Sequence, residues 1–202
     1  GALFPFSAPF RSRWPNAVAV ARRVCRPATA IQTALNSVRD AFGGTLVFPN
    51  GITKISGNIV TNFNTKRGQV KLMGDGGKSV IHITGGAKVM EFQNAPQVIV
   101  EGLTFVGTPG VGVYDFTQNL LFFNVVEQAI IRDCRFLGLA VNAPEDITFS
   151  LNGTHGIVVA VETTLLVEAC HFQGNGTVNC PNIGGYNHHG MTVRDTLCND
   201  FG

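Results

Sequence analysis

A ten-residue pattern that occurs three times is the feature that most restricts the fold of this chain. It reads VIVEGLTFVG at residues 98–107, AIIRDCRFLG at 129–138 and LLVEACHFQG at 165–174. Each copy has apolar residues at its first and third positions, Phe at its eighth and Gly at its tenth. A second alternating pattern lies just upstream, with apolar residues at 90 and 92, 121 and 123, and 157 and 159. Both patterns recur after 31 and then 36 residues, which indicates structural repeats.

Each repeat predicts short strands and contains no helical pattern long enough for a crossover helix. Equivalent strands should therefore stack in parallel and in register, about 4.8 Å apart, as in a β-solenoid. The inward ladders that this stacking predicts are Val98/Ala129/Leu165, Val100/Ile131/Val167, Leu103/Cys134/Cys170 and Phe105/Phe136/Phe172. A fourth copy is expected at HHGMTVR, where Val193 would continue the upstream ladder of Phe92, Phe123 and Val159.

Residues 29–42 predict one helix in front of the solenoid. Apolar residues at 31, 34, 35, 38 and 42 have helical spacing, Thr29 and Gln32 suit a capping box, and Gly43-Gly44 supplies a stop. Such a helix can cover the open end of the first strands. Residues 1–28 are rich in Pro, aromatic residues and Arg, and they predict a separate extended arm.

The composition restricts the class of protein and its partners. Hydrophobic residues make up 45% of the chain and charged residues 14%, with a net charge of +2. This excludes a disordered chain, and no apolar run is long enough to span a membrane. Nucleic acid is not an expected partner, because no basic face is visible outside the arm. The start at Gly1 and the incomplete fourth copy predict a processed or truncated piece that associates with itself or a neighbouring chain through residues 1–20 and 190–202.

The stretch AIQTALNSVRDAFGGTLVFPNGITKISGNI, followed by VKLMGDGGKSVIHI, resembles the pectate-lyase-like superfamily. Members typically open with a capping helix, Gly-Gly, a strand ending in Phe-Pro and an Ile-Ser-Gly strand. The resemblance implies an all-β fold, a right-handed parallel β-helix over residues 29–202 with residues 29–42 as an N-terminal capping helix. It also implies an extracellular or surface-exposed protein that binds or degrades polysaccharide, as a lyase or hydrolase. The alternative is a non-catalytic structural module of a fibre, tailspike or surface assembly.

The repeats differ in the connection that follows the ten-residue pattern. Eleven residues separate Gly107 from Asn119, sixteen separate Gly138 from His155, and fourteen separate Gly174 from His189. Variable connections on a constant scaffold are the usual place for a site. Histidine can transfer protons near neutral pH, and glycoside hydrolysis needs two carboxyl groups. The catalytic candidates at or near these connections are His155, His189, Glu145, Asp146 and Asp195, and the substrate-binding candidates are Asn119, Tyr114, Tyr186, His188 and Arg194.

Two further interpretations of these histidines stay open. The motif THG at 154–156, repeated as HHG at 188–190, resembles the Gly-His-Gly of polygalacturonase-type hydrolases without its first glycine. The alternative is a polar ladder at the strand starts, formed by Lys88, Asn119, His155 and His189.

The remaining polar and sulfur-containing residues predict no cofactor. Cysteine and histidine spacings fit no metal site, and Ca2+ is the metal that the resemblance alone admits. The sequons at Asn152 and Asn175 are either chance or N-glycosylation sites of a secreted protein. Glu101, Arg132 and Glu168 predict a surface charge ladder, and Cys134 and Cys170 predict buried thiols.

Overall fold

The structure, a computed structural model, describes residues 17–19, 28–56, 59–63, 68–85, 88–107, 119–137, 155–160, 164–173, 183–186 and 190–199. Strands make up most of these residues, and every strand pair among them is parallel. One α-helix and one short 3-10 turn, η1 (Gly76–Lys78), complete the described elements. This confirms the expectation of a mostly β chain built from parallel strands.

The described strands form three sheets. Sheet A contains, in spatial order, β1 (Ala17–Ala19), β2 (Gly44–Val47), β5 (Gln69–Met73), β8 (Gln97–Glu101), β11 (Gln128–Arg132), β14 (Thr164–Glu168) and β17 (Gly190–Arg194). Sheet B contains β3 (Gly51–Ser56), β6 (Ser79–Gly85), β9 (Thr104–Gly107), β12 (Arg135–Leu137), β15 (His171–Gln173) and β18 (Leu197–Asn199). Sheet C contains β4 (Ile59–Asn62), β7 (Lys88–Gln93), β10 (Asn119–Asn124), β13 (His155–Ala160) and β16 (Ile183–Tyr186).

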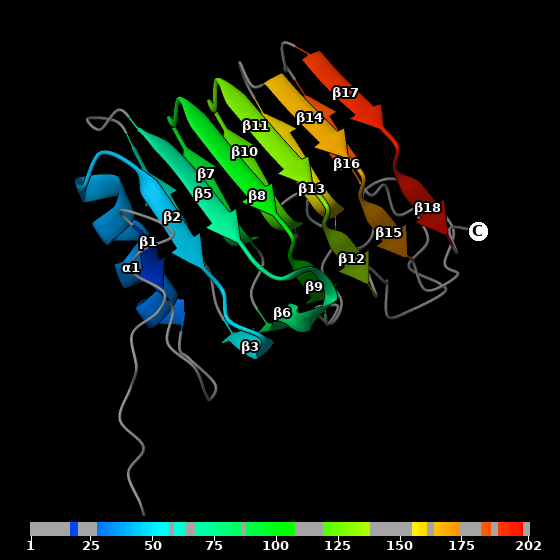
Figure 1. Cartoon of the computed structure of the whole chain (residues 1–202). Coiled ribbons are helices and arrows are strands. Elements are labelled where there is room, and N and C mark those ends of the chain that lie inside the picture. The colour runs from blue at the N-terminus through cyan, green and yellow to red at the C-terminus, as the bar shows by residue number, and fades with distance from the viewer. Residues whose placement is uncertain are drawn as a thin grey trace, which may run out of the picture.

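From β2 onward the chain visits the sheets in the fixed order A, B, C, so neighbouring strands of one sheet belong to successive repeats. Figure 1 shows this advance, with the strands of sheet A side by side in chain order from blue to red. The arrangement is solenoid-like, and buried residues of all three sheets form one apolar core.

The predicted inward ladders are confirmed. Phe105, Phe136 and Phe172 lie opposite one another in sheet B, and none has measurable exposure. Their rings stack with centroid separations of 5.1 and 4.6 Å and nearly parallel planes. Phe92 and Phe123 form a second stack, 5.6 Å apart, in sheet C. In-register pairing therefore brings identical side chains of successive repeats into direct contact.

The predicted position of the fourth copy is wrong. Val193 pairs with Val167 in sheet A, whereas the sheet C strand of this repeat is β16, in which Gly185 lies opposite Val159. The repeat is thus 26 residues long, counted from Val159 to Gly185 or from Val167 to Val193. The sequence IGGY of β16 has no apolar alternation, and for this reason the pattern pointed to the next apolar strand.

Helix α1 (Ala28–Asp40) lies against β2 and β4 and buries Ile31, Leu35 and Val38. The predicted capping box does not form, because Thr29 is already inside the helix. Gln32 instead bonds to the edge strand β4: its Nε2 donates to the carbonyl oxygen of Val60 at 2.7 Å, and its Oε1 accepts from the Val60 N–H at 2.8 Å. This side chain therefore satisfies backbone groups that an edge strand would otherwise leave without a strand partner.

The corner between sheets A and B has a left-handed backbone in four successive repeats. The residues at this corner are Gly102, Asp133, Ala169 and Asp195, with φ of 64°, 53°, 51° and 51°. Glycine is required by space only at the first of them, because an added Cβ at Gly102 would lie 2.7 Å from the carbonyl oxygen of Gly74. The corner between sheets C and A has the same conformation at Asn94 and Val125, with φ of 53° and 54°.

Part of the predicted arm also belongs to a sheet. Strand β1 pairs in parallel with β2, so residues 17–19 extend sheet A at its first edge.

Replacing Phe136 by alanine should reduce the free energy of unfolding by about 3–5 kcal/mol, because it removes the middle ring of the sheet B stack and leaves a cavity. Urea denaturation measures the change. Phe42→Ala is the matched control, since 61% of the Phe42 side chain is exposed and its loss should cost less than about 1 kcal/mol. Equal costs for the two variants would contradict the stacked core.

Val125→Asn should raise the free energy of unfolding by about 1 kcal/mol, because a β-branched residue is strained at positive φ whereas asparagine is tolerated there. The equivalent corner one repeat earlier already carries Asn94 with nearly the same φ. The reciprocal change, Asn94→Val, should destabilise by a similar amount. Thermal denaturation of both variants is the check, and a loss of stability in Val125→Asn would show that its side-chain contacts outweigh backbone strain.

Candidate functional site

Variation in chain length is concentrated at the corner between sheets B and C. The connections from sheet B to sheet C contain eleven residues after β9, 17 after β12 and nine after β15, but only two after β3 and β6. These three long connections are the ones that the sequence marks as a site, and the third ends earlier than the sequence predicts because β16 begins at Ile183. They lie outside the described residues. The described part of the chain therefore has to be searched for binding groups of its own.

Amide side chains gather at the opposite ends of the sheet C strands, where the chain turns into sheet A. This amide edge consists of Asn62, Gln69, Gln93, Asn94, Gln97, Asn124 and Gln128. Asn62, Gln93 and Asn124 lie in register at the ends of their strands, and Gln69, Gln97 and Gln128 lie in register at the starts of the sheet A strands. All seven are partly or fully exposed. Three successive turns of the chain thus present the same chemical groups.

Hydrogen bonds organise this amide edge along the axis of the stack. Gln69 Nε2 donates to Gln97 Oε1, and Gln97 Nε2 donates to Gln128 Oε1. In the other row, Asn62 Nδ2 donates to Gln93 Oε1 at 3.1 Å. A primary amide carries two donors and two acceptor lone pairs, so a ladder that uses one of each still has capacity for a ligand.

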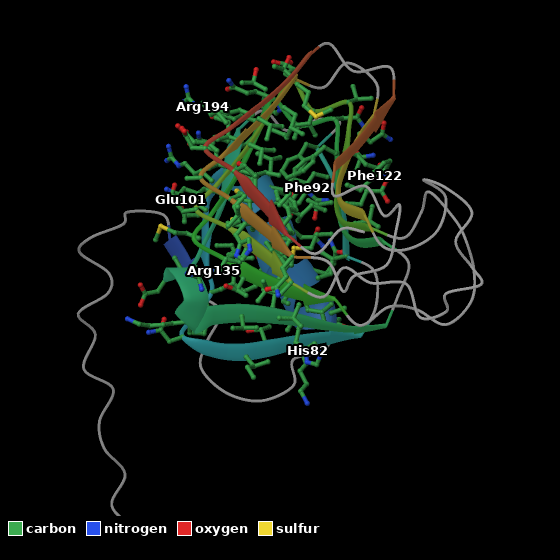
Figure 2. All side chains as sticks on the ribbon, turned by 90° about the vertical axis from the view of Figure 1, so that its right-hand side faces the viewer. His82, Phe92, Glu101, Phe122, Arg135 and Arg194 are labelled. Atoms are coloured by element: carbon green, nitrogen blue, oxygen red, sulfur yellow. The ribbon has the colours of Figure 1, made fainter. Side chains whose placement is uncertain are left out.

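Two buried side chains lie beside the amide edge on the outer face of sheet C. Glu91 and Phe122 occupy the row that Val60 begins, and their exposures are 7% and 5% against 41% for Val60. Glu91 Oε1 accepts a 2.5 Å hydrogen bond from Gln93 Nε2, which fixes the orientation of the Gln93 amide. Figure 2 shows Phe92 inside the stack and Phe122 on the outer side of the same sheet.

The structure places some of the predicted site residues and separates them. Asn119 and His155 begin β10 and β13 and lie opposite each other, as the polar-ladder interpretation expects, with Lys88 on the other side of Asn119. Tyr186 ends β16. Arg194 and Asp195 lie at the corner between sheets A and B, away from the strand starts that carry His155. The left-handed backbone of Asp195 accounts for an aspartate there without any chemistry.

The last member of the predicted polar ladder, His189, lies outside the described residues. Sheet C continues after β13 with β16, whereas Gly190 pairs with Thr164 in sheet A. Lys88, Asn119 and His155 are the members of the ladder that the described residues include. The other predicted residues lie outside the described part of the chain and stay predictions: Tyr114, Glu145, Asp146, His188 and His189, together with the sequons at Asn152 and Asn175.

The sequence reasoning missed the amide edge, although a signal was present. Gln97 and Gln128 immediately precede the first two copies of the ten-residue pattern, and Gln69 precedes the equivalent strand β5. The ten-residue pattern begins one residue after Gln97 and one residue after Gln128, where the apolar alternation starts. A repeated polar residue one position upstream was therefore outside the pattern.

The outer face of sheet A carries the predicted charge ladder. Glu101 accepts from Lys71 at 2.9 Å and from Arg132 at 2.7 Å, and Arg194 pairs with Glu168 at 2.7 Å. Burial by itself would raise the pKa of Glu101, but the hydrogen bonds and charges of Lys71 and Arg132 outweigh it and hold this pKa below its usual value. Figure 2 shows Glu101 and Arg194 on the same outer side.

The predicted buried thiols are also confirmed. Cys134 and Cys170 lie in one inward ladder with exposures of 1% and 3%. Burial raises the pKa of the Cys134 thiol well above its usual value, so this sulfur stays protonated and unreactive at neutral pH.

Within the described residues, no group of three or more His, Cys, Asp or Glu side chains could hold a metal ion. No described helix is long and apolar enough to cross a membrane. Comparison of the chain with family models, curated proteins and solved structures finds no significant match.

Glu101→Gln should lower the free energy of unfolding by about 1 kcal/mol at pH 7, because it removes the carboxylate that pairs with Lys71 and Arg132. A carboxyl group whose pKa is lowered on folding stabilises the protein above its unfolded pKa of about 4.3. That contribution disappears as the pH falls through the still lower folded pKa. Urea denaturation at pH 7 and near pH 2.5 should therefore show a difference that vanishes in acid, whereas Glu127→Gln, at an exposed glutamate, should show none at either pH.

Proposed function

We propose that this chain is an extracellular or surface-exposed protein that binds polysaccharide along the amide edge. The observation that carries the proposal is the gathering of seven amide side chains on three successive turns at one edge of the stack. As the scaffold we propose a closed, right-handed parallel β-helix in which α1 covers the first end of the core. The burial of Ile31, Leu35 and Val38 and the bonds of Gln32 to β4 support that role of the helix.

The chemistry of the amide edge matches that of sugar hydroxyl groups. A hydroxyl group both donates and accepts hydrogen bonds, and so does a carboxamide. Successive rows lie about 4.8 Å apart along the stack, so a linear polymer lying parallel to the axis meets the same groups at each step. Hydrogen bonds from Asn62 to Gln93 and from Gln93 to the Glu91 carboxylate hold the two amides in place before a ligand arrives, which reduces the ordering cost of binding.

Cleavage of the bound polymer is the second part of the proposal. We assign proton transfer to His155, which begins β13 next to the longest connection, with Glu145 or Asp146 as the carboxyl partner. The start and end of a six-residue strand are about 17 Å apart, so a polymer would have to reach from the amide edge across sheet C to meet His155. Binding and cleavage can therefore be tested separately.

Polysaccharide binding should fall at least about fivefold when Gln97 and Gln128 are both changed to alanine, because two hydrogen-bonding groups are lost at about 0.5–1.5 kcal/mol each. Affinity electrophoresis against a panel of neutral and acidic polysaccharides measures the change. Gln173→Ala is the matched control, since this exposed glutamine lies on sheet B. Unchanged retention of the double variant on every polysaccharide that the native protein binds would refute the amide edge as the site.

Cleavage is followed in the same preparation by unsaturated-product absorbance and reducing-end assays. His155→Ala should lower turnover at least about 100-fold, the low end of general acid–base contributions, without changing retention in the gel. Binding without any turnover in the native protein would leave a polysaccharide-binding module and remove the catalytic assignment.

A structural module is the second candidate, and one observation favours it. Met191, Val193 and Leu197 on β17 and β18 are 37%, 47% and 55% exposed, although the first two continue inward ladders of sheet A. We propose that a second copy of the chain covers this apolar surface. Light scattering distinguishes the two functions: a defined oligomer that binds no polysaccharide supports the structural module, whereas a monomer that binds polysaccharide removes it.

A further inference from the structure

The outer face of sheet B differs in charge from the other two sheets. Its six strands contain Lys54, His82, Arg135 and His171 and no aspartate or glutamate. Sheet A balances its cations with Glu101 and Glu168, and sheet C contains Glu91. We call these four side chains of sheet B the cationic face.

Strand alternation places all four on the outside. Their neighbours Ile55, Ile81, Phe136 and Phe172 belong to the core, and Lys54 and Arg135 are exposed while His82 and His171 are partly exposed. Figure 2 shows His82 on the outer side of sheet B, away from the core. The four side chains are therefore accessible from one side of the molecule.

The cationic face consists of two pairs. His82 lies directly opposite Lys54 in the neighbouring strand, and His171 lies directly opposite Arg135. Paired strands are about 4.8 Å apart, so one oxyanion can contact both members of a pair. The pairs are separated by β9, which contributes the neutral residues Thr104 and Val106. Along the stack their centres are three strand spacings, about 14 Å, apart. They are also offset by two residues along the strands, because His82 is in register with Val106 and Arg135 with Thr104.

Among the residues that the structure describes, other charged groups border this face at its corner with sheet A. The guanidinium group of Arg135 lies close to Gly77 of η1, and the neighbouring Asp75 and Lys78 form an ion pair at 3.4 Å. Asp133 and Asp195 occupy the same corner in later repeats. Across the sheet, His82 faces Lys54 and Val106, while His171 faces Arg135 and Leu197. Each histidine thus has a permanent cation on one side and an apolar residue on the other.

We propose that the cationic face binds a sulfated polysaccharide lying along the stack. A sulfate ester carries a full charge and three terminal oxygens, so one group can accept hydrogen bonds from both members of a pair. Two pairs about 14 Å apart favour a polymer with several anionic groups, because the second contact becomes intramolecular once the first has formed. This surface is separate from the amide edge, and its ligand binds independently of the proposed function.

Both members of each pair can contribute a donor to the same group. The Lys54 ammonium and the Arg135 guanidinium group carry permanent charge, and the imidazole ring opposite each of them can donate a hydrogen bond through a ring N–H group. A sulfate ester is a permanent anion, so its charge does not depend on the buffer.

The test measures binding of a fully sulfated heparin octasaccharide by isothermal titration calorimetry. The expected result is at least about tenfold weaker binding by the Lys54→Gln/Arg135→Gln variant than by the native protein. Arg39→Gln/Arg194→Gln is the matched control, because it removes the same charge from two cations that pair with acids elsewhere. His82→Ala/His171→Ala, which removes the two imidazole donors, should also bind the octasaccharide more weakly than the native protein. Thermal denaturation of each variant confirms that it is folded.

Three ligand controls decide the chemistry. The desulfated octasaccharide, which keeps its carboxylates, should bind at least about tenfold more weakly, and a sulfated disaccharide should also bind weakly. Equal binding of the desulfated ligand, or tighter binding of a single-stranded oligothymidylate of the same charge, would overturn the assignment to sulfate. Equal losses of affinity in the Lys54→Gln/Arg135→Gln and Arg39→Gln/Arg194→Gln variants would overturn the cationic face itself. The Gln97→Ala/Gln128→Ala variant should bind the octasaccharide normally, which separates this proposal from the amide edge.

Discussion

In-register parallel pairing between successive repeats is the constraint on which the rest of this structure depends. It places each residue directly above its equivalent in the preceding repeat, so any side chain at one position is followed by its counterpart about 4.8 Å away. For apolar residues the consequence is favourable. Phe105, Phe136 and Phe172 stack ring on ring, and each covers the exposed side of its neighbour. The repeated sequence pattern is the direct result, because every repeat has to present the same apolar face in two directions.

The same constraint limits what the outer faces can carry. Like charges directly opposite each other in neighbouring strands repel, so a ladder of charges has to alternate or be diluted. Sheet A solves this by alternation, with Glu101, Arg132, Glu168 and Arg194 in register. The edge between sheets C and A avoids charge and uses amides, which stack as donor and acceptor. Sheet B does neither. Each of its pairs combines a permanent cation with a histidine, so in its described strands no two permanently charged groups lie directly opposite each other.

Much of the scaffold could be predicted from the sequence, because ladders of identical apolar residues leave a visible period. The inward positions of three repeats and the buried thiols of Cys134 and Cys170 follow from that period alone. The fourth repeat could not be placed in the same way, since β16 reads IGGY and its position is fixed by backbone pairing rather than by apolar side chains. Gln32 was assigned to a cap within its own helix, but its partner Val60 lies 28 residues away. A sequence pattern within the helix cannot reveal that contact.

The candidate sites were harder to predict than the scaffold, for a related physical reason. The cationic face is built from four different repeats with different spacings. Its members, Lys54, His82, Arg135 and His171, lie on one face only because their strands share one sheet. No local pattern links them, so the sequence showed no basic face.

Asp195 illustrates the opposite error, in which a conspicuous residue has a structural explanation. Four successive repeats place Gly102, Asp133, Ala169 and Asp195 at the same corner with nearly the same positive φ. Glycine, aspartate and alanine share no chemistry that a site could use, but all of them can be held in this backbone conformation, and aspartate and glycine adopt it most readily. The residue at this corner is therefore restricted by the positive φ of the backbone and not by the chemistry of its side chain. Backbone conformation alone therefore accounts for a carboxylate at such a position, and no catalytic role is needed. Glu91 is different, because it is buried at an outward position and hydrogen-bonded to Gln93, and backbone conformation does not account for it.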